Sequence, residues 1–112
     1  MGDRSNIKIT YPSGESIYFY GHWMGARNIE IARDVLSTSG DRAGDPEYLA
    51  RMVFSRMVRD DIDGSTGYGI SPTLMDNENK VAHIQYAHEK WGWAPALKLE
   101  EEDGDLIMEV VY

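Results

Sequence analysis

Apolar and polar residues alternate over the first twenty positions in a way that predicts a β-hairpin. From Ile7 to Tyr11 every second residue is apolar, and Ile17 and Phe19 alternate with tyrosines further on. The tripeptide Pro-Ser-Gly at 12–14 lies between the two runs and is typical of a tight turn. The two runs are therefore expected to pair as antiparallel strands.

Two helices are predicted after this hairpin. From about Asn28, apolar residues recur at helical spacing, and Gly40 is a typical stop signal. A second helix is expected to begin at Asp45 and Pro46, because a carboxylate caps a helix and proline fits its first turn. An apolar stripe supports this helix, which is expected to end at about Arg59.

The second half of the chain reads as a loop followed by strands. Residues 60–79 are rich in Gly, Asp, Ser and Asn, and so long a loop is expected to have a function or to hold a short strand. Strands are predicted over 81–93, from Leu97, and over 106–112. This order favours an α+β fold: an antiparallel sheet of about five strands with two helices packed on one face.

Length and composition indicate one domain over residues 1–112, inside the cell. The chain has no cysteine, which excludes disulfides and thiolate metal sites and agrees with a reducing compartment. No apolar run approaches the roughly 20 residues that cross a bilayer. We therefore expect a cytoplasmic protein that does not span a membrane.

Charge is distributed unevenly between the two halves. Residues 1–59 carry eight bases and seven acids, and residues 60–112 carry three bases and twelve acids. All seven arginines lie in the first half, so an anion site is expected there, since the guanidinium fork suits phosphate and carboxylate. The acidic half is expected to be a solvated face, and a chain of net charge -8 is a poor binder of nucleic acid.

Several motifs of known chemistry fail on inspection. Aligning Gly64 with the invariant glycine of a calcium loop puts Arg59 and Ile70 at positions that need acidic ligands. The glycine-rich run 64–69 is not a phosphate-binding fingerprint, and His83 and His88 are spaced to face opposite sides of a strand. No catalytic residue, no metal and no cofactor is expected.

The stretch YFYGHWMGARN at 18–28 nominates a ligand site. It joins a strand to the start of a helix, where unpaired backbone N–H groups and the helix dipole attract anions. The residues nominated are the aromatic and polar side chains, the glycine that permits close approach and the arginine that binds phosphate: Tyr20, His22, Trp23, Gly25 and Arg27. Aromatic planes beside an anion site suit a nucleotide better than bare phosphate.

Structural alternatives remain for Trp23, His22 and the glycines. Trp23 could anchor the core, His22 could bond a carbonyl to fix the turn, and the glycines could simply permit it. On the second helix, Tyr48 and Arg51 could reach the same pocket if the helices pack side by side. Arg51 could equally pair with Glu47, four residues earlier.

Three segments together resemble a family of small, functionally uncharacterised bacteriophage and bacterial proteins. They are YFYGHW-G at 18–25, DPEYLARMVFSRM at 45–57, and DIDGSTGYGISP at 61–72 followed by DNE at 76–78. The family's signature is an aromatic strand ending in His-Trp-Gly-Gly, a YLAR helix, then TGFGIS and DNE. This chain has Met24 in place of the family's glycine, and its last 30 residues match no part of that pattern.

The resemblance implies a shared fold, a phage origin and no known catalytic residues. Small acidic phage proteins often interfere with host defence, by sequestering a nucleotide signal or by occupying a host protein. The candidate pocket residues that the resemblance implies are His22, Trp23, Gly25, Tyr48, Arg51, Gly67, Gly69, Asp76 and Asn77.

Three functions follow as hypotheses. The first is a non-catalytic binding protein for an anionic, nucleotide-like small molecule, sequestering a host defence signal in the host cytoplasm. The second is an acidic protein that mimics nucleic acid through residues 100–105 and blocks a basic partner. The third is a nucleotide hydrolase with His22 as base and Asp76 as its orienter or a metal ligand. A homodimer or higher homo-oligomer is also expected, because a short chain leaves strand edges exposed.

Overall fold

The predicted hairpin forms as part of a larger sheet. β1 (Ser5–Thr10) pairs antiparallel with β2 (Ser16–Gly21), with Ile7 opposite Phe19. These two side chains are buried on one face of the hairpin. Because side chains alternate along a strand, Lys8 and Tyr18, which are also paired, lie on the opposite face.

The structure, a computed structural model, describes residues 3–59, 64, 67–75, 77–89, 92–100 and 106–111. The side chains of residues 41, 87–89, 92–93, 98–100 and 106–111 lie outside this description. The remaining strands and helices are α1 (Arg27–Thr38), the 3-10 helix η1 (Gly40–Gly44), α2 (Pro46–Met57), β3 (Tyr68–Ser71), β4 (Val81–Glu89), β5 (Gly92–Glu100) and β6 (Leu106–Val111).

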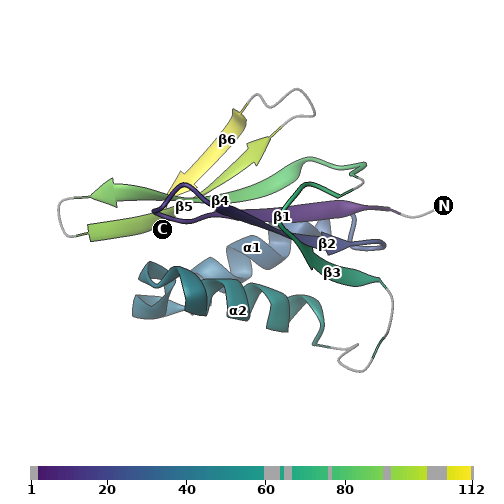
Figure 1. Cartoon of the computed structure of the whole chain (residues 1–112), viewed down its shortest axis with the longest axis horizontal. Helices are drawn as coiled ribbons and strands as arrows, with labels where there is room; N and C mark the ends of the chain where they lie inside the picture. The colour runs from purple at the N-terminus through teal and green to yellow at the C-terminus, as the bar shows by residue number, and fades with distance from the viewer. Residues whose placement is uncertain are drawn as a thin grey trace.

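Six strands make one open sheet, in the order β3-β2-β1-β4-β5-β6, and both helices cover the same face of it (Figure 1). This confirms the α+β fold with two helices on one face. One neighbouring pair, β1 with β4, is parallel, whereas a wholly antiparallel sheet was expected. The chain passes through both helices between these strands, and nothing in the local pattern of either strand fixes the direction of so distant a partner.

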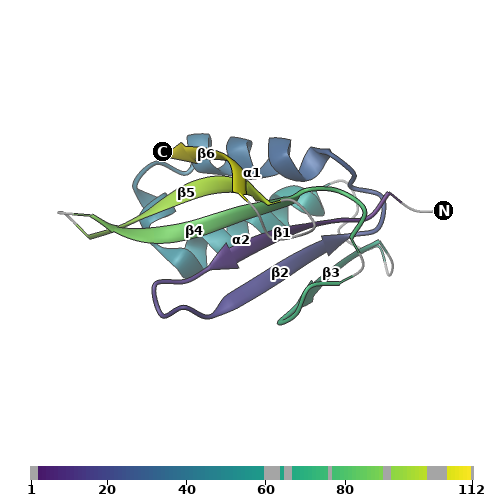
Figure 2. The same cartoon turned by 90° about the horizontal axis from the view of Figure 1, so that it is seen from above.

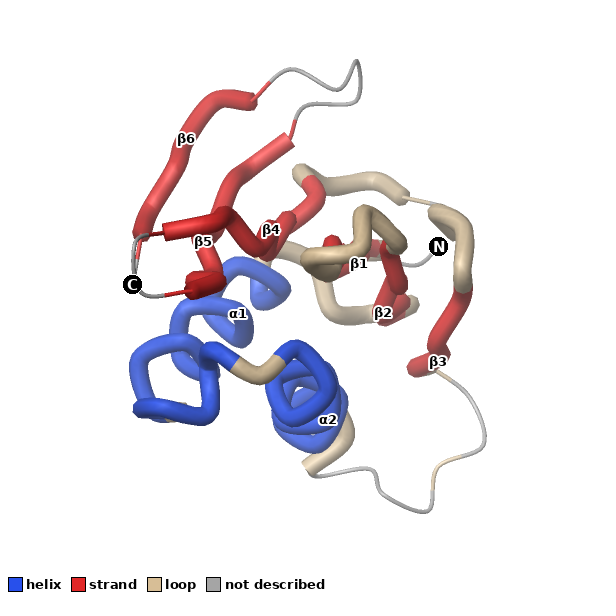
Figure 3. The backbone as a smooth tube through the Cα atoms, turned by 60° about the vertical axis from the view of Figure 1, so that its left-hand side comes forward, coloured by secondary structure: helices blue, strands red, loops and turns tan. Residues whose placement is uncertain are grey.

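The helices meet the sheet through the apolar stripes that their spacing predicted. Figure 3, an end view, shows both helices beneath one side of a strongly curved sheet. The buried core combines Met24 with three sets of residues: Ile31, Ala32, Val35 and Leu36 of α1; Leu49, Val53 and Met57 of α2; and Ile7, Ile9, Phe19, Ala82, Ile84, Tyr86 and Leu97 of the sheet.

The cap of α2 differs from the expectation. Asp45 is the N-cap residue of α2, but its carboxylate makes no capping hydrogen bond; its backbone oxygen accepts one from the Leu49 N–H. The carboxylate lies close enough to Tyr86 to raise the pKa of that phenol, although burial is the larger cause. The Tyr86 hydroxyl donates to the Ala43 carbonyl at 2.5 Å, so this tyrosine joins the sheet to η1.

The long segment 60–79 does hold a short strand, β3, which pairs antiparallel with β2. β5 begins at Gly92, five residues before the predicted start at Leu97. Among the described residues, no helix has the length and apolar character needed to span a membrane.

Candidate functional site

Tyr20, His22 and Trp23 form a cluster of aromatic rings at the end of β2, which we call the aromatic corner. The Tyr20 hydroxyl lies 2.9 Å from Nδ1 of His22. The His22 ring meets the Trp23 indole edge to face, with ring centroids 4.7 Å apart and planes at 77°. At the end of β2, Tyr20 therefore contacts His22, and His22 contacts Trp23.

Trp23 is 62% exposed, whereas its neighbour Met24 is 1% exposed and belongs to the core. The alternative in which Trp23 anchors the core is therefore wrong. Met24 fills the space beside Gly21, where an added Cβ would come within 2.6 Å of the methionine Cβ. The turn thus buries the flexible thioether and leaves the indole in solvent.

β3 brings two more of the predicted residues to the aromatic corner. The His22 N–H donates to the Gly67 carbonyl at 2.7 Å, and Gly67 has a φ of 100°, which favours glycine. Gly69 is paired with Tyr20, and no atom lies within 4 Å of where its Cβ would be. The side of Tyr20 that faces β3 therefore borders open space.

Several backbone N–H groups of the turn after Trp23 are hydrogen-bonded within the turn itself. The N–H groups of Arg27, Asn28 and Ile29 donate to carbonyls three residues earlier, and the Ile29 N–H also bonds the Asn28 side-chain oxygen. At Gly25, with a φ of 54°, an added Cβ would lie 2.2 Å from Oδ2 of Asp3. The position expected for a phosphate is therefore beside a carboxylate.

Arg27 lies on the other side of the sheet from Tyr20. Its guanidinium donates to the Tyr68 hydroxyl at 3.3 Å, and Nε lies 3.4 Å from the Met24 carbonyl oxygen. Tyr68 is paired with Gly21 and packs against the core under the helices. The structure thus does not bring Arg27 and Tyr20 together in one hollow, although Arg27 remains exposed.

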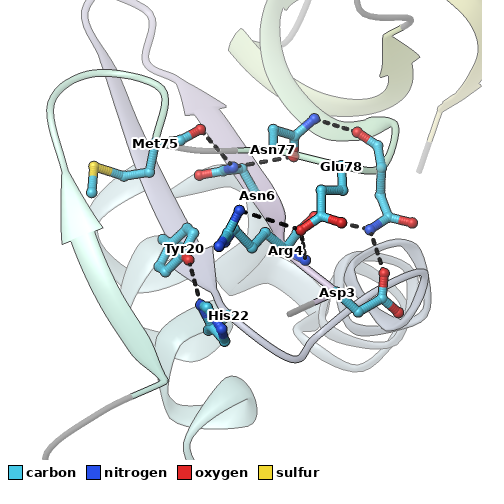
Figure 4. A network of polar contacts seen from close by, with 9 residues as sticks. Asp3, Arg4, Asn6, Tyr20, His22, Met75, Asn77 and Glu78 are labelled. Atoms are coloured by element: carbon cyan, nitrogen blue, oxygen red, sulfur yellow. Dashed lines mark hydrogen bonds and ion pairs between the residues drawn. The ribbon is translucent and has the colours of Figure 1, made fainter. Parts of the chain in front are cut away.

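A network of polar contacts adjoins the aromatic corner on the helix-free face (Figure 4). Asn6, paired with Tyr20, donates to Oδ1 of Asn77 at 3.2 Å and to the Met75 carbonyl at 3.4 Å. Arg4 forms an ion pair with Glu78, with Nη1 and Oε1 3.5 Å apart and both side chains partly exposed. Asn77 is therefore close to the corner, where it helps to hold the segment before β4 against β1.

Tyr48 and Arg51 lie away from the aromatic corner. α2 begins at the end of the sheet that holds Tyr11, whose phenol pKa is raised by burial and by nearby Glu47. The corner lies beside Asp3, at the opposite end of β1, roughly 20 Å along the strand by the usual rise per residue. Tyr48 instead stacks under the Arg42 guanidinium, 4.4 Å from the ring centroid.

The alternative partner for Arg51 is not observed either. Among the residues that the structure describes, ion pairs join Arg4 to Glu78 and Arg56 to Asp34, but Arg51 and Glu47 form none with each other. Asp76 lies outside the described residues, as do 101–105 and the side chain of Glu100. The hydrolase and nucleic-acid-mimic hypotheses depend on these positions.

A shallow hollow of about 300 Å³ lies beside the first turn of α1. Asn28 stands in its wall, and its side-chain amide donates to the carbonyls of Asn6 and Lys80 at 3.0 and 2.8 Å. The other lining residues are Ala26, Ile29, Glu78, Asn79 and Lys80. None of the three rings of the aromatic corner lines it, so the predicted aromatic and anion sites are separate places in the structure.

Sequence reasoning missed Arg4, Asn6 and Asn28 as residues of this region. Arg4 could have been found by extending the hairpin register outward from the turn at 12–14, which places it across from His22. Asn6 and Asn28 have no comparable signal, because their partners come from residues 75–80, far along the chain. Comparisons with models of known protein families, with curated proteins and with solved structures find no match for this chain.

Proposed function

We propose that this protein binds an anionic, nucleotide-like small molecule at the aromatic corner, without turning it over. The observation that carries the proposal is the exposure of Trp23 at 62% while its indole is held edge to face by His22. A large aromatic side chain contributes most to stability when it is buried. An indole held in solvent by a second ring is suited to stacking on a base.

The polar groups of the corner support the same kind of ligand. The Tyr20 hydroxyl is hydrogen-bonded to Nδ1 of His22, and among the described residues none is bonded to Nε2 of that ring. That nitrogen is available to a ribose hydroxyl or a base edge while the indole stacks. Gly69 leaves open space beside Tyr20, so a flat ligand can extend from Trp23 toward β3 without displacing a side chain.

Two arginines lie near the corner on opposite faces of the sheet and are alternative candidates for the phosphate ligand. Arg4 approaches from the helix-free face and is shared with Glu78 at 3.5 Å, a partly exposed pair that holds it only weakly. Arg27 approaches from the helix side, where a neutral phenol is its side-chain partner. We do not propose a phosphate on the backbone of Gly25, because the Asp3 carboxylate already occupies that approach.

The biological setting rests on the resemblance to small phage proteins. A protein that holds a nucleotide without consuming it would lower the free concentration of a host signal in the cytoplasm of an infected cell. Such sequestration needs tight binding and no catalytic group. This setting, like the ligand class, is a proposal.

The test begins with ligand capture. The purified full chain is incubated with a mixture of linear and cyclic mono- and dinucleotides, and mass spectrometry identifies what stays bound after gel filtration. The retained nucleotide is then titrated calorimetrically into wild type and Trp23→Ala. Loss of one stacked base should weaken binding about ten- to a hundredfold. Recovery of the nucleotide unchanged supports binding over hydrolysis.

Tyr48→Ala is the matched control, because Tyr48 is another exposed aromatic residue, at 45%, placed at the far end of the sheet. Its affinity should equal that of wild type. Arg4→Ala and Arg27→Ala then decide which arginine holds the phosphate, since loss of a charge-assisted hydrogen bond weakens binding roughly ten- to a hundredfold. Retention of no nucleotide, or equal affinities in Trp23→Ala and Tyr48→Ala, would overturn the proposal.

A further inference from the structure

β3 forms one edge of the sheet, with β2 as its only neighbour in the strand order (Figure 2). An edge strand presents backbone N–H and C=O groups that can pair with another strand. The groups that face outward can be identified from the pairing. The His22 N–H bonds the Gly67 carbonyl and the two residues are in register, so they form a hydrogen-bonded pair, and so does every second pair along the strand.

By this alternation Gly67, Gly69 and Ser71 turn their N–H and C=O groups toward β2. Tyr68 and Ile70 then direct theirs away from the sheet. The outward edge is therefore built from one aromatic and one β-branched residue on either side of Gly69. These are the residue types that form favourable pairs across two antiparallel strands.

Ile70 on this edge has an apolar, exposed side chain, and so do two residues of the turn that follows β3. Ile70 is 52% exposed, and Leu74 and Met75 in the following turn are 51% and 45% exposed. Residues 67–75 contain no charged side chain, although charged residues make up 27% of the chain. An apolar edge strand without charged side chains lacks the features that usually block pairing with another strand.

We propose that two copies of this chain associate through β3, pairing the two strands antiparallel about a two-fold axis at Gly69. In this register Ile70 of each copy lies opposite Tyr68 of the other, which satisfies all four outward-facing backbone groups. Gly69 meets its own copy at the axis, and the space that its missing side chain leaves allows close approach. The arrangement is self-complementary, as a two-fold interface requires.

The net charge of the chain limits where a second copy can bind. Each chain carries a net charge of -8, so two copies repel one another over most of their surfaces. The uncharged edge at residues 67–75 is a place where they can meet without bringing like charges together. This proposal does not depend on ligand binding, because Trp23 and the His22 ring take no part in the pairing between the two copies.

The test is the mass of the purified full chain in solution. Sedimentation equilibrium over a dilution series should give a dimer of twice 12.7 kDa that dissociates on dilution. Ile70→Lys places two ammonium groups at the interface and should give a monomer over the same range. Tyr48→Lys is the matched control, since it makes the same charge change at a residue of similar exposure away from β3, and it should remain dimeric.

A second measurement avoids substitution at the edge. The Tyr68 and Ile70 amides should exchange with solvent more slowly as protein concentration rises, while amides at other exposed edges do not change. Wild type that remains monomeric at every concentration overturns the proposal. So does an Ile70→Lys dimer, or Tyr68 and Ile70 amides whose exchange is independent of concentration, because each shows that β3 does not pair with a second copy.

Discussion

The carboxylate of Asp3 closes against the backbone of Gly25, where the chain turns into α1. The Gly25 N–H donates to the Asp3 backbone oxygen at 2.8 Å, and Oδ1 of Asp3 accepts from the Asn79 amide at 3.0 Å. A carboxylate near a helix N-terminus is favourable because the dipole is positive there. The Asp3 carboxylate thus lies at the start of α1, where the sequence pattern predicted a bound anion.

Gly25→Ala should therefore destabilise the fold through two effects. An alanine with φ near 54° is strained by about 1–2 kcal/mol, and its Cβ would in addition clash with the Asp3 carboxylate. Gly40→Ala is the matched control, because Gly40 has a φ of 58° and no atom within 4 Å of its Cβ position. Urea unfolding should show a larger loss of free energy for Gly25→Ala, and equal losses would contradict the close contact.

Asn28 leads to a second prediction, because its side chain is fully buried and makes three hydrogen bonds. Asn28→Ala leaves the carbonyls of Asn6 and Lys80 without this donor and should lower the free energy of unfolding by about 2–4 kcal/mol. Asn79→Ala also removes two side-chain bonds, but at a partly exposed position where water can replace them. The Asn79→Ala variant should lower the free energy of unfolding by about 1 kcal/mol or less. Similar losses for the two variants would argue against the buried network.

The sequence predicted those parts of the fold whose signals are local. The hairpin follows from alternation on either side of the turn at 12–14, and both helices from apolar spacing and the proline at 46. The parallel pairing of β1 with β4 was missed, because it joins segments separated by both helices. Hydrophobicity alone also gave no sign that Met24 would be buried and Trp23 exposed, since that choice depends on the space beside Gly21.

The candidate site shows the same division. The strand-to-helix junction correctly brings Tyr20, His22 and Trp23 together, because they are neighbours in sequence. Tertiary packing sets the direction of the Arg27 side chain and the distance between the aromatic corner and Tyr48. The spacing of these residues along the chain predicts neither. Local patterns therefore predicted which aromatic side chains cluster, but not where the charged side chains lie relative to them.

Tyr86 leads to a prediction about pH. Burial, then the nearby acids Asp45 and Glu47 with Tyr11, raise its pKa above the ordinary value of 10.0. A group whose pKa is raised by folding contributes stability that is complete below the unfolded pKa and is lost as the pH rises above it. The free energy of unfolding of wild type should therefore fall as the pH is raised above 10.

The Tyr86→Phe variant isolates this contribution from that of the other tyrosines. It lacks the hydroxyl that donates to Ala43, so it should be less stable by about 1 kcal/mol near neutral pH. Above pH 10 the difference from wild type should shrink, because the variant has no phenol to ionise at this position. Urea titrations at a series of pH values measure this difference, and a gap that widens with pH would show that the sign is wrong.

The last prediction concerns which nitrogen of His22 carries the proton in the neutral ring. A phenol is the stronger donor of the Tyr20 and His22 pair, so the 2.9 Å contact should place the Tyr20 proton toward Nδ1 and leave the imidazole proton on Nε2. Long-range proton–nitrogen NMR spectra distinguish the two tautomers directly. Tyr20→Phe keeps the ring and removes the donor, and it should give a mixture. His83, which contacts Thr10 on β1 through Nε2, serves as the internal reference and should not change. A His22 protonated on Nδ1 in wild type would mean that the imidazole donates to Tyr20, and Nε2 would then face the proposed ligand as an acceptor.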